Sequence, residues 1–294
     1  MNGIIVVDKP EGWTSHDVVN RMRRLAGTKK VGHLGTLDPL ATGVLPLVVG
    51  RATRLAQFYT RRDKMYEGVI RFGFSTDTYD RAGAPTSPEV APPALDSAML
   101  EPYLQRFRGK FMQTPPPVSA KKVAGRPAYE LARKNIAVEL APVEVQVYEL
   151  AALGIDGPDV RVRAFCSAGT YLRAIAHDLG REVGCGAHLY ELRRTESGDF
   201  TLEQARTLEQ LQALSAEGRL AEALIPAAQL LPEFPSEYVD EITEGQIRQG
   251  RDFQVSPFRV QKGAPYMKAL SRTGELVAIG EIKLPNLYHP SIVL

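Results

Sequence analysis

The strongest constraint on the fold lies in one stretch, VGHLGTLDPLATGVLPLVVG, at residues 31–50. Its centre is Asp38, which precedes Pro39 and has a glycine-bearing turn on either side. Because a residue before proline is pushed out of the α region, Asp38 should project from a loop rather than lie in a helix. The apolar residues 44–49 predict a short buried strand behind that loop. The pattern therefore predicts a carboxylate presented from a rigid sheet, although a structural Asp-Pro turn or helix cap has the same local sequence.

The composition is that of an ordinary globular protein. The 294 residues are 44% hydrophobic and 24% charged, enough for one large domain or for a large and a small one. The apolar run that follows Met1 is too short for a secretory signal, and no run reaches membrane-spanning length, so we expect a cytoplasmic protein without membrane contact. Cys166 and Cys185 are widely spaced and lack a histidine cluster, which argues against a disulfide scaffold and against a metal site.

The net charge of +2 is mild, but the basic residues are unevenly distributed. One cluster precedes the Asp38 loop and a second follows it. The two clusters consist of Arg21, Arg23, Arg24, Lys29 and Lys30, and of Arg51, Arg54, Arg61, Arg62 and Lys64. Solvated helix faces would explain either cluster alone. Two clusters that flank one loop favour a surface that follows phosphates.

The period of the apolar residues predicts helices and strands in mixed order. Helices are predicted at about residues 15–26, 52–59, 99–107, 171–179 and 202–213, and strands at about 3–7, 44–49, 66–74, 143–150, 160–166 and 189–194. Thr14 and Asp17 form a capping box at the first helix, and Thr170 is expected to cap the helix that carries Arg173. Because a cation at a helix N-terminus opposes the helix dipole, Arg173 should have a carboxylate partner.

Two proline-rich stretches divide the second half of the chain. QTPPPVSAKKVAGRPAYELAR, residues 113–133, is led by prolines and rich in lysine, which fits either a disordered linker or a flexible flap that closes on a polyanion. Prolines also recur at residues 226–235 and mark a boundary. Beyond it, a helix at 238–250 and strands at 266–270 and 276–284 predict a small β-rich module.

Six blocks along the chain resemble, in order, the bacterial tRNA pseudouridine-55 synthases of the TruB type. The blocks are DKPEGWTS from Asp8, GHLGTLDPLATGVLP from Gly32, YEGVIRFGFSTDTYDRAG from Tyr66, the stretch 113–133, SAGTYLRAIAHDLG from Ser167 and GAHLYELRR from Gly186. The resemblance implies an α+β pseudouridine-synthase fold, with a central mixed, largely antiparallel sheet flanked by helices. It further implies a catalytic domain at residues 1–230, an RNA-binding flap at about 113–137, and a PUA-like RNA-binding β-barrel at 235–294.

The resemblance also implies a set of site residues. Asp38 matches the essential aspartate, Arg173 its arginine partner and Tyr66 the active-site tyrosine. Leu192 matches an apolar wall, and His33 the histidine that packs against the extruded nucleotide. The expected substrate-binding residues also include Lys9, Lys121, Lys122 and Arg126. Without the resemblance, core packing would explain Tyr66 and Leu192, and an ordinary loop histidine would explain His33.

Two residues depart from the family pattern. Leu34 stands where many relatives have threonine, and Val118 stands where an aromatic residue usually precedes the Ser-Ala of the flap. Neither is expected to touch Asp38. They are expected to affect only how tightly the loop or the flap grips RNA.

The implied reaction isomerises the T-loop uridine at position 55 of tRNA to pseudouridine. It breaks the C1′–N1 glycosidic bond, joins C1′ to C5 and needs no cofactor. Asp38 could act as a nucleophile at C1′, as an electrostatic stabiliser or as a base on a ribose proton. Hydrolytic glycosidases usually pair two carboxylates, whereas one is expected in this pocket. Because the uridine is stacked inside a folded loop, the enzyme must flip it out.

Other functions remain open on the sequence. One is a guide-RNA-dependent pseudouridine synthase, which the long flap and the absence of basic extensions disfavour. Another is an RNA chaperone that folds tRNA without chemistry, either as the main role or beside catalysis. A carbohydrate hydrolase is disfavoured by the missing second carboxylate. The expected partner is the T-arm stem-loop of tRNA, and we expect a monomer because an asymmetric RNA ligand needs no symmetric protein.

Overall fold

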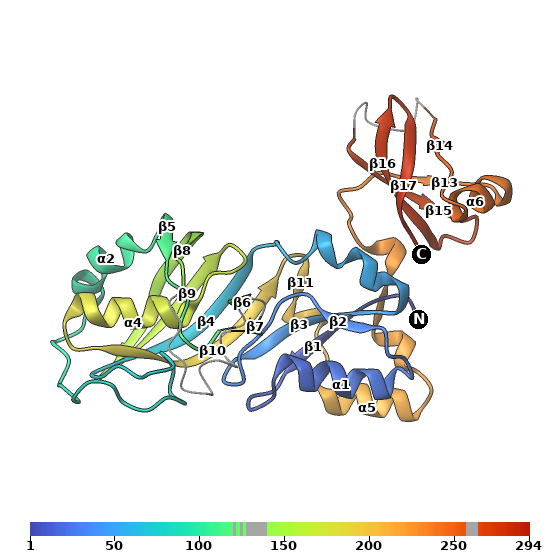
Figure 1. The fold of residues 1–294 in the computed structure, drawn as a ribbon. Coiled ribbons are helices and arrows are strands. Elements are labelled where there is room, and N and C mark those ends of the chain that lie inside the picture. Colours follow the sequence, from blue (N-terminus) through green and yellow to red (C-terminus); the bar gives the residue numbers. More distant parts are fainter. Residues whose placement is uncertain (120–121, 124–125, 128–139, 257–263) are drawn as a thin grey trace.

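The computed structural model describes residues 1–119, 122–123, 126–127, 140–256 and 264–294. Its centre is a ten-stranded sheet with the order β12-β1-β3-β10-β4-β9-β8-β5, to which β2 adds beside β3 and β11 beside β10 (Figure 1). The strands are β1 Gly3–Lys9, β2 Val31–His33, β3 Thr42–Val49, β4 Lys64–Phe72, β5 Gly109–Gln113, β8 Val143–Asp156, β9 Asp159–Cys166, β10 Ala187–Ser197, β11 Phe200–Thr201 and β12 Leu224–Pro226.

Among the described strand pairs of this sheet, only β3 and β10 run parallel. The predicted mixed, largely antiparallel sheet is therefore confirmed. Two short strands do not belong to this sheet. They are β6 Lys122–Val123 and β7 Arg126–Pro127, which pair with each other in a small two-stranded sheet.

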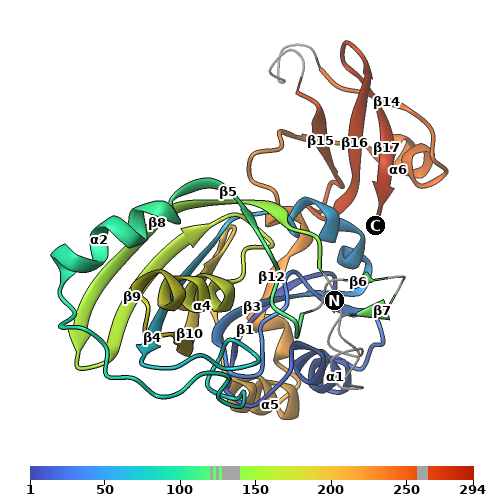
Figure 2. The same ribbon diagram turned by 60° about the vertical axis from the view of Figure 1, so that its left-hand side comes forward.

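The main helices pack on one face of this sheet. They are α1 Ser15–Leu25, α2 Ser97–Arg106, α4 Leu172–Val183 and α5 Leu208–Ala216. Side chains from all four join one buried apolar cluster with the strands, and α2 and α4 cover one half of the sheet while α1 and α5 cover the other (Figures 1 and 2). Among the described helices, none combines the length and the apolar character needed to cross a membrane.

The first strand shows why the sheet needs cover on both faces. In β1, Ile5 and Val7 join the helix-side cluster, whereas Ile4 and Val6 join a second cluster on the opposite face. Because alternate residues of a strand point to opposite faces, a run such as GIIVV is stable only where both faces are buried. The second face is covered by the 3₁₀ helix η1 Gly50–Phe58 and by the C-terminal part of the chain.

The C-terminal residues form a separate five-stranded sheet, confirming the predicted β-rich module. Its strands are β13 Ser236–Tyr238, β14 Phe253–Gln254, β15 Tyr266–Leu270, β16 Leu276–Leu284 and β17 Leu287–Val293, in the order β13-β15-β16-β17-β14, with α6 Glu241–Arg248 beside them. The module has its own core and stands next to η1 in both views (Figures 1 and 2). The buried Lys268 fastens it, because its Nζ donates to the carbonyl oxygens of Ala228 and Leu230 at 3.2 and 3.0 Å.

Several predicted elements have the expected bounds and several do not. The capping box of Thr14 and Asp17 is present at α1, and β15 and β16 begin and end as predicted. The helix predicted at 52–59 is instead a 3₁₀ helix, in which the buried Ala52 and Leu55 are three residues apart, matching the shorter 3₁₀ repeat.

Two helix starts were predicted too early. The helix predicted at 202–213 begins only at Leu208, where Thr207 and Gln210 form a capping box, and residues 202–204 make a separate 3₁₀ turn, η2 Leu202–Gln204. The helix predicted at 238–250 is also shorter, because Tyr238 is the last residue of β13 and α6 begins only at Glu241. In both cases a capping side chain sets the start, and the apolar period does not show where that cap lies.

We predict that Gly43→Ala lowers the free energy of unfolding by more than about 2 kcal/mol. Gly43 has φ +99°, and an added Cβ would lie 2.2 Å from the carbonyl oxygen of Arg194 on the parallel neighbour β10. The control is Gly184→Ala, because Gly184 has φ +92° but open space around it, so it should lose only about 1–2 kcal/mol of backbone strain. Urea unfolding measures both, and equal losses would show that the close approach of β3 and β10 is not what Gly43 permits.

Candidate active site

The buried hydroxyl of Ser15 holds the Asp38 loop by two hydrogen bonds. The Oγ of Ser15, at the start of α1, accepts from the Leu37 N–H at 2.8 Å and donates to the Leu37 carbonyl at 3.0 Å. The carbonyl of Asp38 accepts from the Ala41 N–H at 3.0 Å, which closes the turn around Pro39. The backbone carbonyls on both sides of the Asp38 Cα, those of Leu37 and Asp38, are therefore hydrogen-bonded. These bonds leave the backbone of Asp38 little freedom.

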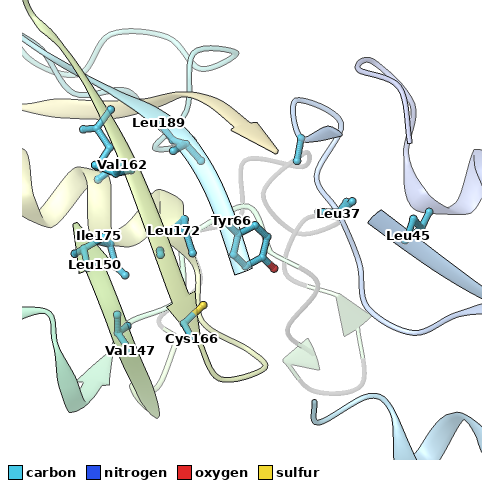
Figure 3. Packing of buried hydrophobic residues seen from close by; sticks show 14 of the residues in the cluster. Leu37, Leu45, Tyr66, Val147, Leu150, Val162, Cys166, Leu172, Ile175 and Leu189 are labelled. Atoms are coloured by element: carbon cyan, nitrogen blue, oxygen red, sulfur yellow. The ribbon is translucent and has the colours of Figure 1, made fainter. Parts of the chain in front are cut away.

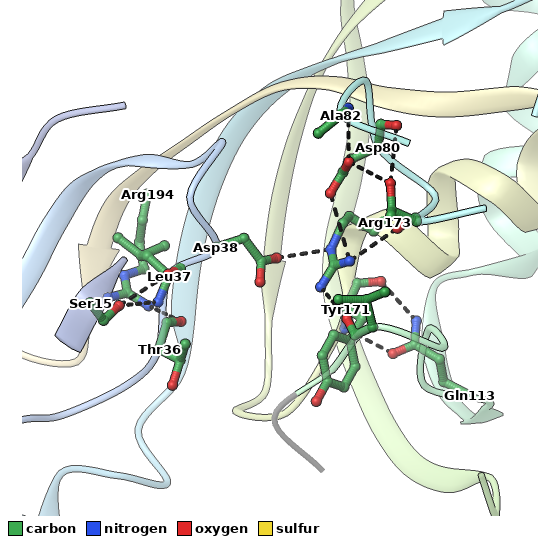
Figure 4. Close-up of polar contacts among 12 residues, drawn as sticks. Ser15, Thr36, Leu37, Asp38, Asp80, Ala82, Gln113, Tyr171, Arg173 and Arg194 are labelled. Atoms are coloured by element: carbon green, nitrogen blue, oxygen red, sulfur yellow. Dashed lines mark hydrogen bonds and ion pairs between the residues drawn. The ribbon is translucent and has the colours of Figure 1, made fainter. Parts of the chain in front are cut away.

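A buried arginine holds the other side of the same loop. Arg194 of β10 is almost completely buried and points its guanidinium at backbone carbonyls. Its Nε donates to Val44 at 2.7 Å, and its Nη atoms donate to Gly35 at 3.1 Å and Thr36 at 3.4 Å. Sequence reasoning missed this residue, since an Arg-Arg pair in a strand does not indicate which arginine points inward. Arg194 links β3, β10 and the loop in one network (Figure 4).

Lys9, which the resemblance assigns to substrate binding, lies behind the Asp38 loop. Its side chain is fully buried, and its Nζ donates to the carbonyl oxygens of Pro10 at 2.8 Å, Trp13 at 2.7 Å and Pro39 at 3.4 Å. Burial lowers the pKa of this ammonium to about 8, although the nearby Asp38 opposes the shift. Lys9 therefore supports the turn around Pro39 from the protein interior.

Arg173 is the centre of the site. Its side chain is only 4% exposed, and its Nε lies 2.9 Å from Oδ2 of Asp38, so the carboxylate partner expected for this arginine is present. The approach is off the N–H axis, which makes the contact an ion pair rather than a linear hydrogen bond. The Nη1 and Nη2 atoms donate to the carbonyls of Thr78 and Val118, both at 3.0 Å (Figure 4). Asp38 itself keeps a side-chain exposure of 34%, so one edge of its carboxylate remains accessible.

A second carboxylate shares this arginine. Oδ2 of Asp80 lies 3.7 Å from Arg173 Nη1, and its Oδ1 accepts from Thr78 Oγ1 at 2.7 Å and from the Ala82 N–H at 3.0 Å. Among the described residues, Asp38 is the only carboxylate that lines the pocket. Arg173, however, lies close to two carboxylates, those of Asp38 and Asp80. Sequence reasoning missed Asp80, because the STDTYD segment has a second aspartate, Asp77, and no pattern separates the two.

The helix that carries Arg173 is capped differently from the prediction. Tyr171, not Thr170, is the N-cap of α4, and its own side chain does not cap the helix. The buried Gln113 serves instead: its Oε1 accepts from the Tyr171 N–H at 2.8 Å and its Nε2 donates to the Tyr171 carbonyl at 3.1 Å. Thr170 lies with its Oγ1 3.3 Å from Ser167 Oγ. Gln113 is the first residue of the predicted flap. The flap segment therefore starts next to the N-terminus of α4, the helix that carries Arg173.

These groups surround a pocket of about 200 Å³. Its wall brings together Asp38, Tyr66, Arg173 and Leu192, four of the predicted site residues, from four parts of the chain. The other lining residues are Gly35, Thr36, Leu37, Thr60, Lys64, Ala168, Gly169, Thr170, Tyr171, Leu172 and Arg194. Figure 3 shows the Tyr66 ring near the start of β4, on the side toward the segment that carries Leu37. Burial raises the pKa of the Tyr66 phenol, so the ring is neutral at ordinary pH.

Of the remaining predicted residues, His33 is described by the structure and does not line this pocket. His33, at the end of β2, is half-buried, and its Nδ1 accepts from the Gly35 N–H at 3.4 Å. Burial and the charge of Arg194 lower the pKa of His33. Lys121 and the side chains of Lys122 and Arg126 lie outside the described part of the structure.

Lys64 also lines the pocket, although sequence reasoning did not assign it there. It precedes Tyr66 by two positions on β4, so both point to the same face of the sheet. Its Nζ donates to the carbonyls of Thr60, at 3.3 Å, and Arg62. Burial lowers the pKa of Lys64 to about 8.

Among the described residues, no three His, Cys, Asp or Glu side chains gather in a way that could hold a metal ion.

The sequence matches two family models over most of its length. The model of the TruB family pseudouridylate synthase N-terminal domain matches residues 23–172, and that of the tRNA pseudouridylate synthase B C-terminal domain matches residues 173–232. The chain belongs to the TruB family of pseudouridine synthases. The two models meet between Leu172 and Arg173, and residues from both matched segments line the pocket.

Several curated TruB proteins share much of the sequence. The tRNA pseudouridine synthase B of Solibacter usitatus is 66% identical over 294 residues, which is 100% of both chains. The proteins of the same name from Thermobifida fusca and Aromatoleum aromaticum are 48% and 43% identical, over 77% and 85% of this chain and 80% of each relative.

Solved structures share the fold at lower identity. The crystal structure of a Cbf5-Nop10-Gar1 complex contains a chain with a TM-score of 0.70 and 26% identity, covering 98% of this chain and 83% of that one. An H/ACA RNP bound to a substrate RNA containing 2′-deoxyuridine contains a chain with a TM-score of 0.70 and 25% identity, covering 99% and 84%. The predicted pseudouridine-synthase fold is thereby confirmed.

We predict that Lys9→Met changes how stability depends on pH. Because burial holds the pKa of Lys9 at about 8 in the folded protein, against 10.5 for a free lysine, the unfolded chain binds more protons between these two values. The free energy of unfolding of the native protein should therefore rise relative to that of the variant as the pH increases from about 8 to about 10.5. This difference in the free energy of unfolding between the native protein and Lys9→Met should grow by about 3 kcal/mol over that pH range. Urea unfolding at a series of pH values measures it, and parallel curves would contradict this account of the buried ammonium.

Proposed function

We propose that this TruB family enzyme isomerises the T-loop uridine of tRNA, position 55, to pseudouridine, with Asp38 as the catalytic carboxylate. The observation that carries the proposal is the partly exposed Asp38 carboxylate, which lines the pocket and is ion-paired to the buried Arg173. The substrate is supported by the relatives, since proteins named tRNA pseudouridine synthase B match up to the full length of this chain.

The chemistry requires a carboxylate in a fixed position next to the ribose. Breaking the C1′–N1 bond builds positive character on the sugar, and Asp38 acts there as a nucleophile, as an electrostatic stabiliser or as the base for a ribose proton. Arg173 orients the carboxylate, and its own position is set by Asp80 and by the carbonyl of Thr78. The cleaved uracil stays in the pocket, turns and is joined to C1′ through C5.

The size and lining of the pocket fit one nucleoside rather than a stretch of RNA. The uridine therefore leaves the stacked T-loop before it reacts, at a cost of a few kcal/mol. Tyr66 stacks on the flipped base, Leu192 excludes water, and His33 packs against the nucleotide outside the pocket wall. Contacts to phosphates offset the cost of flipping.

The phosphate contacts come from several parts of the chain. In this proposal the exposed basic residues before and after the Asp38 loop face the RNA, and Lys121, Lys122 and Arg126 of the flap, at about residues 113–137, close over it. In this proposal residues 1–230 are the catalytic domain and residues 235–294 are a PUA-like module that holds RNA. The C-terminal family model ends at residue 232, which supports a boundary there. The enzyme acts as a monomer on the T-arm and also helps tRNA to fold.

A guide-RNA-dependent synthase is the second candidate, because the structural neighbours come from a Cbf5-Nop10-Gar1 complex and an H/ACA RNP. Those neighbours are only 25–26% identical to this chain, whereas the Solibacter usitatus enzyme is 66% identical over its full length. The stand-alone tRNA enzyme is therefore the better supported function.

The decisive experiment uses an unmodified tRNA transcript with tritium at C5 of uridine, since forming the C1′–C5 bond must release that label. The native protein should release tritium without added metal or nucleotide. Asp38→Asn should lower the rate by more than about a thousandfold while tRNA binding is retained, because the carboxylate acts on the reacting sugar. A native protein that binds tRNA tightly and releases no label would contradict the proposal and favour a chaperone or a guide-dependent enzyme.

Binding of tRNA should weaken with salt. Between 50 and 200 mM salt the affinity should fall at least about tenfold, because each phosphate contact releases counterions. Replacing the exposed Lys29 and Lys30 by glutamine should reduce the slope of log affinity against log salt by up to about 2. The control is Arg219→Gln, since Arg219 is exposed but already paired with Glu217 and Glu222. Filter retention measures all three proteins, and a slope that does not depend on Lys29 and Lys30 would remove them from the RNA surface.

A further inference from the structure

Helix α4 holds the segment 78–80 at two points, one helical turn apart. At the first point, Arg173 Nη1 donates to the Thr78 carbonyl at 3.0 Å and lies 3.7 Å from Asp80 Oδ2. At the second point, the His177 ring stacks on the Tyr79 ring, with centroids 3.8 Å apart and an angle of 12° between the planes. Residues four apart on a helix lie on the same face, so one face of α4 meets three consecutive residues of the segment.

The backbone of Tyr79 is strained in a way that serves this contact. Tyr79 has φ +65°, a left-handed conformation that a residue with a bulky side chain rarely adopts. Hydrogen bonds hold it there: its N–H donates to the Thr76 carbonyl at 3.3 Å, and its carbonyl accepts from the Leu189 N–H at 3.0 Å. The sharp turn lies between the two residues that contact Arg173. It directs the ring to α4 while Thr78 and Asp80 reach the guanidinium.

The His177 ring depends on the stack for its orientation. Its Nδ1 is buried and has no hydrogen-bond partner within the described residues. Burial lowers the pKa of His177, with Asp178 and Arg181 as the nearby charges, so the ring is neutral at pH 7 and presents an uncharged face. Burial likewise raises the pKa of the Tyr79 phenol. The contact is thus a stack of two neutral rings.

We propose that Tyr79 and His177 are positioning residues for Arg173. Their stack fastens the segment 78–80 to α4, so that Thr78 and Asp80 hold the guanidinium in the orientation in which it pairs with Asp38. The proposal rests on the proposed function, in which Asp38 carries out the chemistry. Neither ring lines the pocket, so their removal should affect the chemical step and not the binding of tRNA.

The test compares variants that remove a ring with variants that keep one. Tyr79→Asn removes the ring but tolerates the left-handed backbone, and His177→Ala removes the partner ring. Each should lower kcat in the tritium-release assay by about three- to tenfold, while KM stays within about twofold. Tyr79→Phe and His177→Phe keep a flat ring and should retain at least about half of the native kcat. The double variant Tyr79→Asn with His177→Ala should be no slower than about the slower single variant, because both remove the same contact.

Other kinetic results would overturn the proposal. These are a native kcat in both Tyr79→Asn and His177→Ala, a loss that appears only in KM, or a loss of equal size in the phenylalanine variants. Urea unfolding checks that each variant is folded. If Tyr79→Asn is not, His177→Ala tests the same contact from the helix side.

A second readout does not depend on activity. In protein labelled with ¹⁵N-arginine, the Nε–Hε signal of Arg173, assigned by its disappearance in Arg173→Lys, should shift or broaden in Tyr79→Asn and His177→Ala. It should stay in place in the phenylalanine variants. A signal that does not move in Tyr79→Asn and His177→Ala would overturn the proposal. A native protein that releases no tritium would instead overturn the proposed function, and the spectra would still decide whether the stack positions Arg173.

Discussion

The structure depends on burying one positive charge, the guanidinium of Arg173. A buried charge is stable only if it is paired and its donors are satisfied. Here the oxygen atoms come from Asp38, Thr78, Asp80 and Val118, which belong to three separate segments of the chain. The site therefore forms only when the loop before β3, the segment after β4 and the segment that carries Val118 have all reached α4.

The other cations at the site are used differently. Lys9, Lys64 and Arg194 are buried, and their hydrogen bonds go to backbone carbonyls rather than to carboxylates. They fix the loop and the pocket floor without neutralising Asp38. Among the described residues this leaves one carboxylate lining the pocket, oriented by one arginine, which is the preorganised arrangement that the proposed electrostatic role of Asp38 needs.

The position of the pocket follows from the sheet. The parallel pair β3 and β10 joins the N-terminal strands to the larger antiparallel half, and the Asp38 loop enters directly before β3 (Figure 1). The same strand β10 carries Leu192 and Arg194, so one strand supplies both a wall and a support. The two departures from the family pattern fit this framework. Leu34 is buried in the cluster on the opposite face, and position 118 contributes a backbone carbonyl, which valine supplies as well as an aromatic residue would.

The sequence by itself determined the features that depend on near neighbours. Pro39 kept Asp38 out of a helix, the Thr14 and Asp17 box marked the start of α1, and a cation in the first turn of α4 required a carboxylate. Only the tertiary structure decided that Gln113 caps α4, that Asp80 shares Arg173 and that Lys9 points inward. The physical reason is distance along the chain. Apolar period, caps and turns report interactions within about four residues, whereas the partner of a buried polar group is chosen by how distant segments pack.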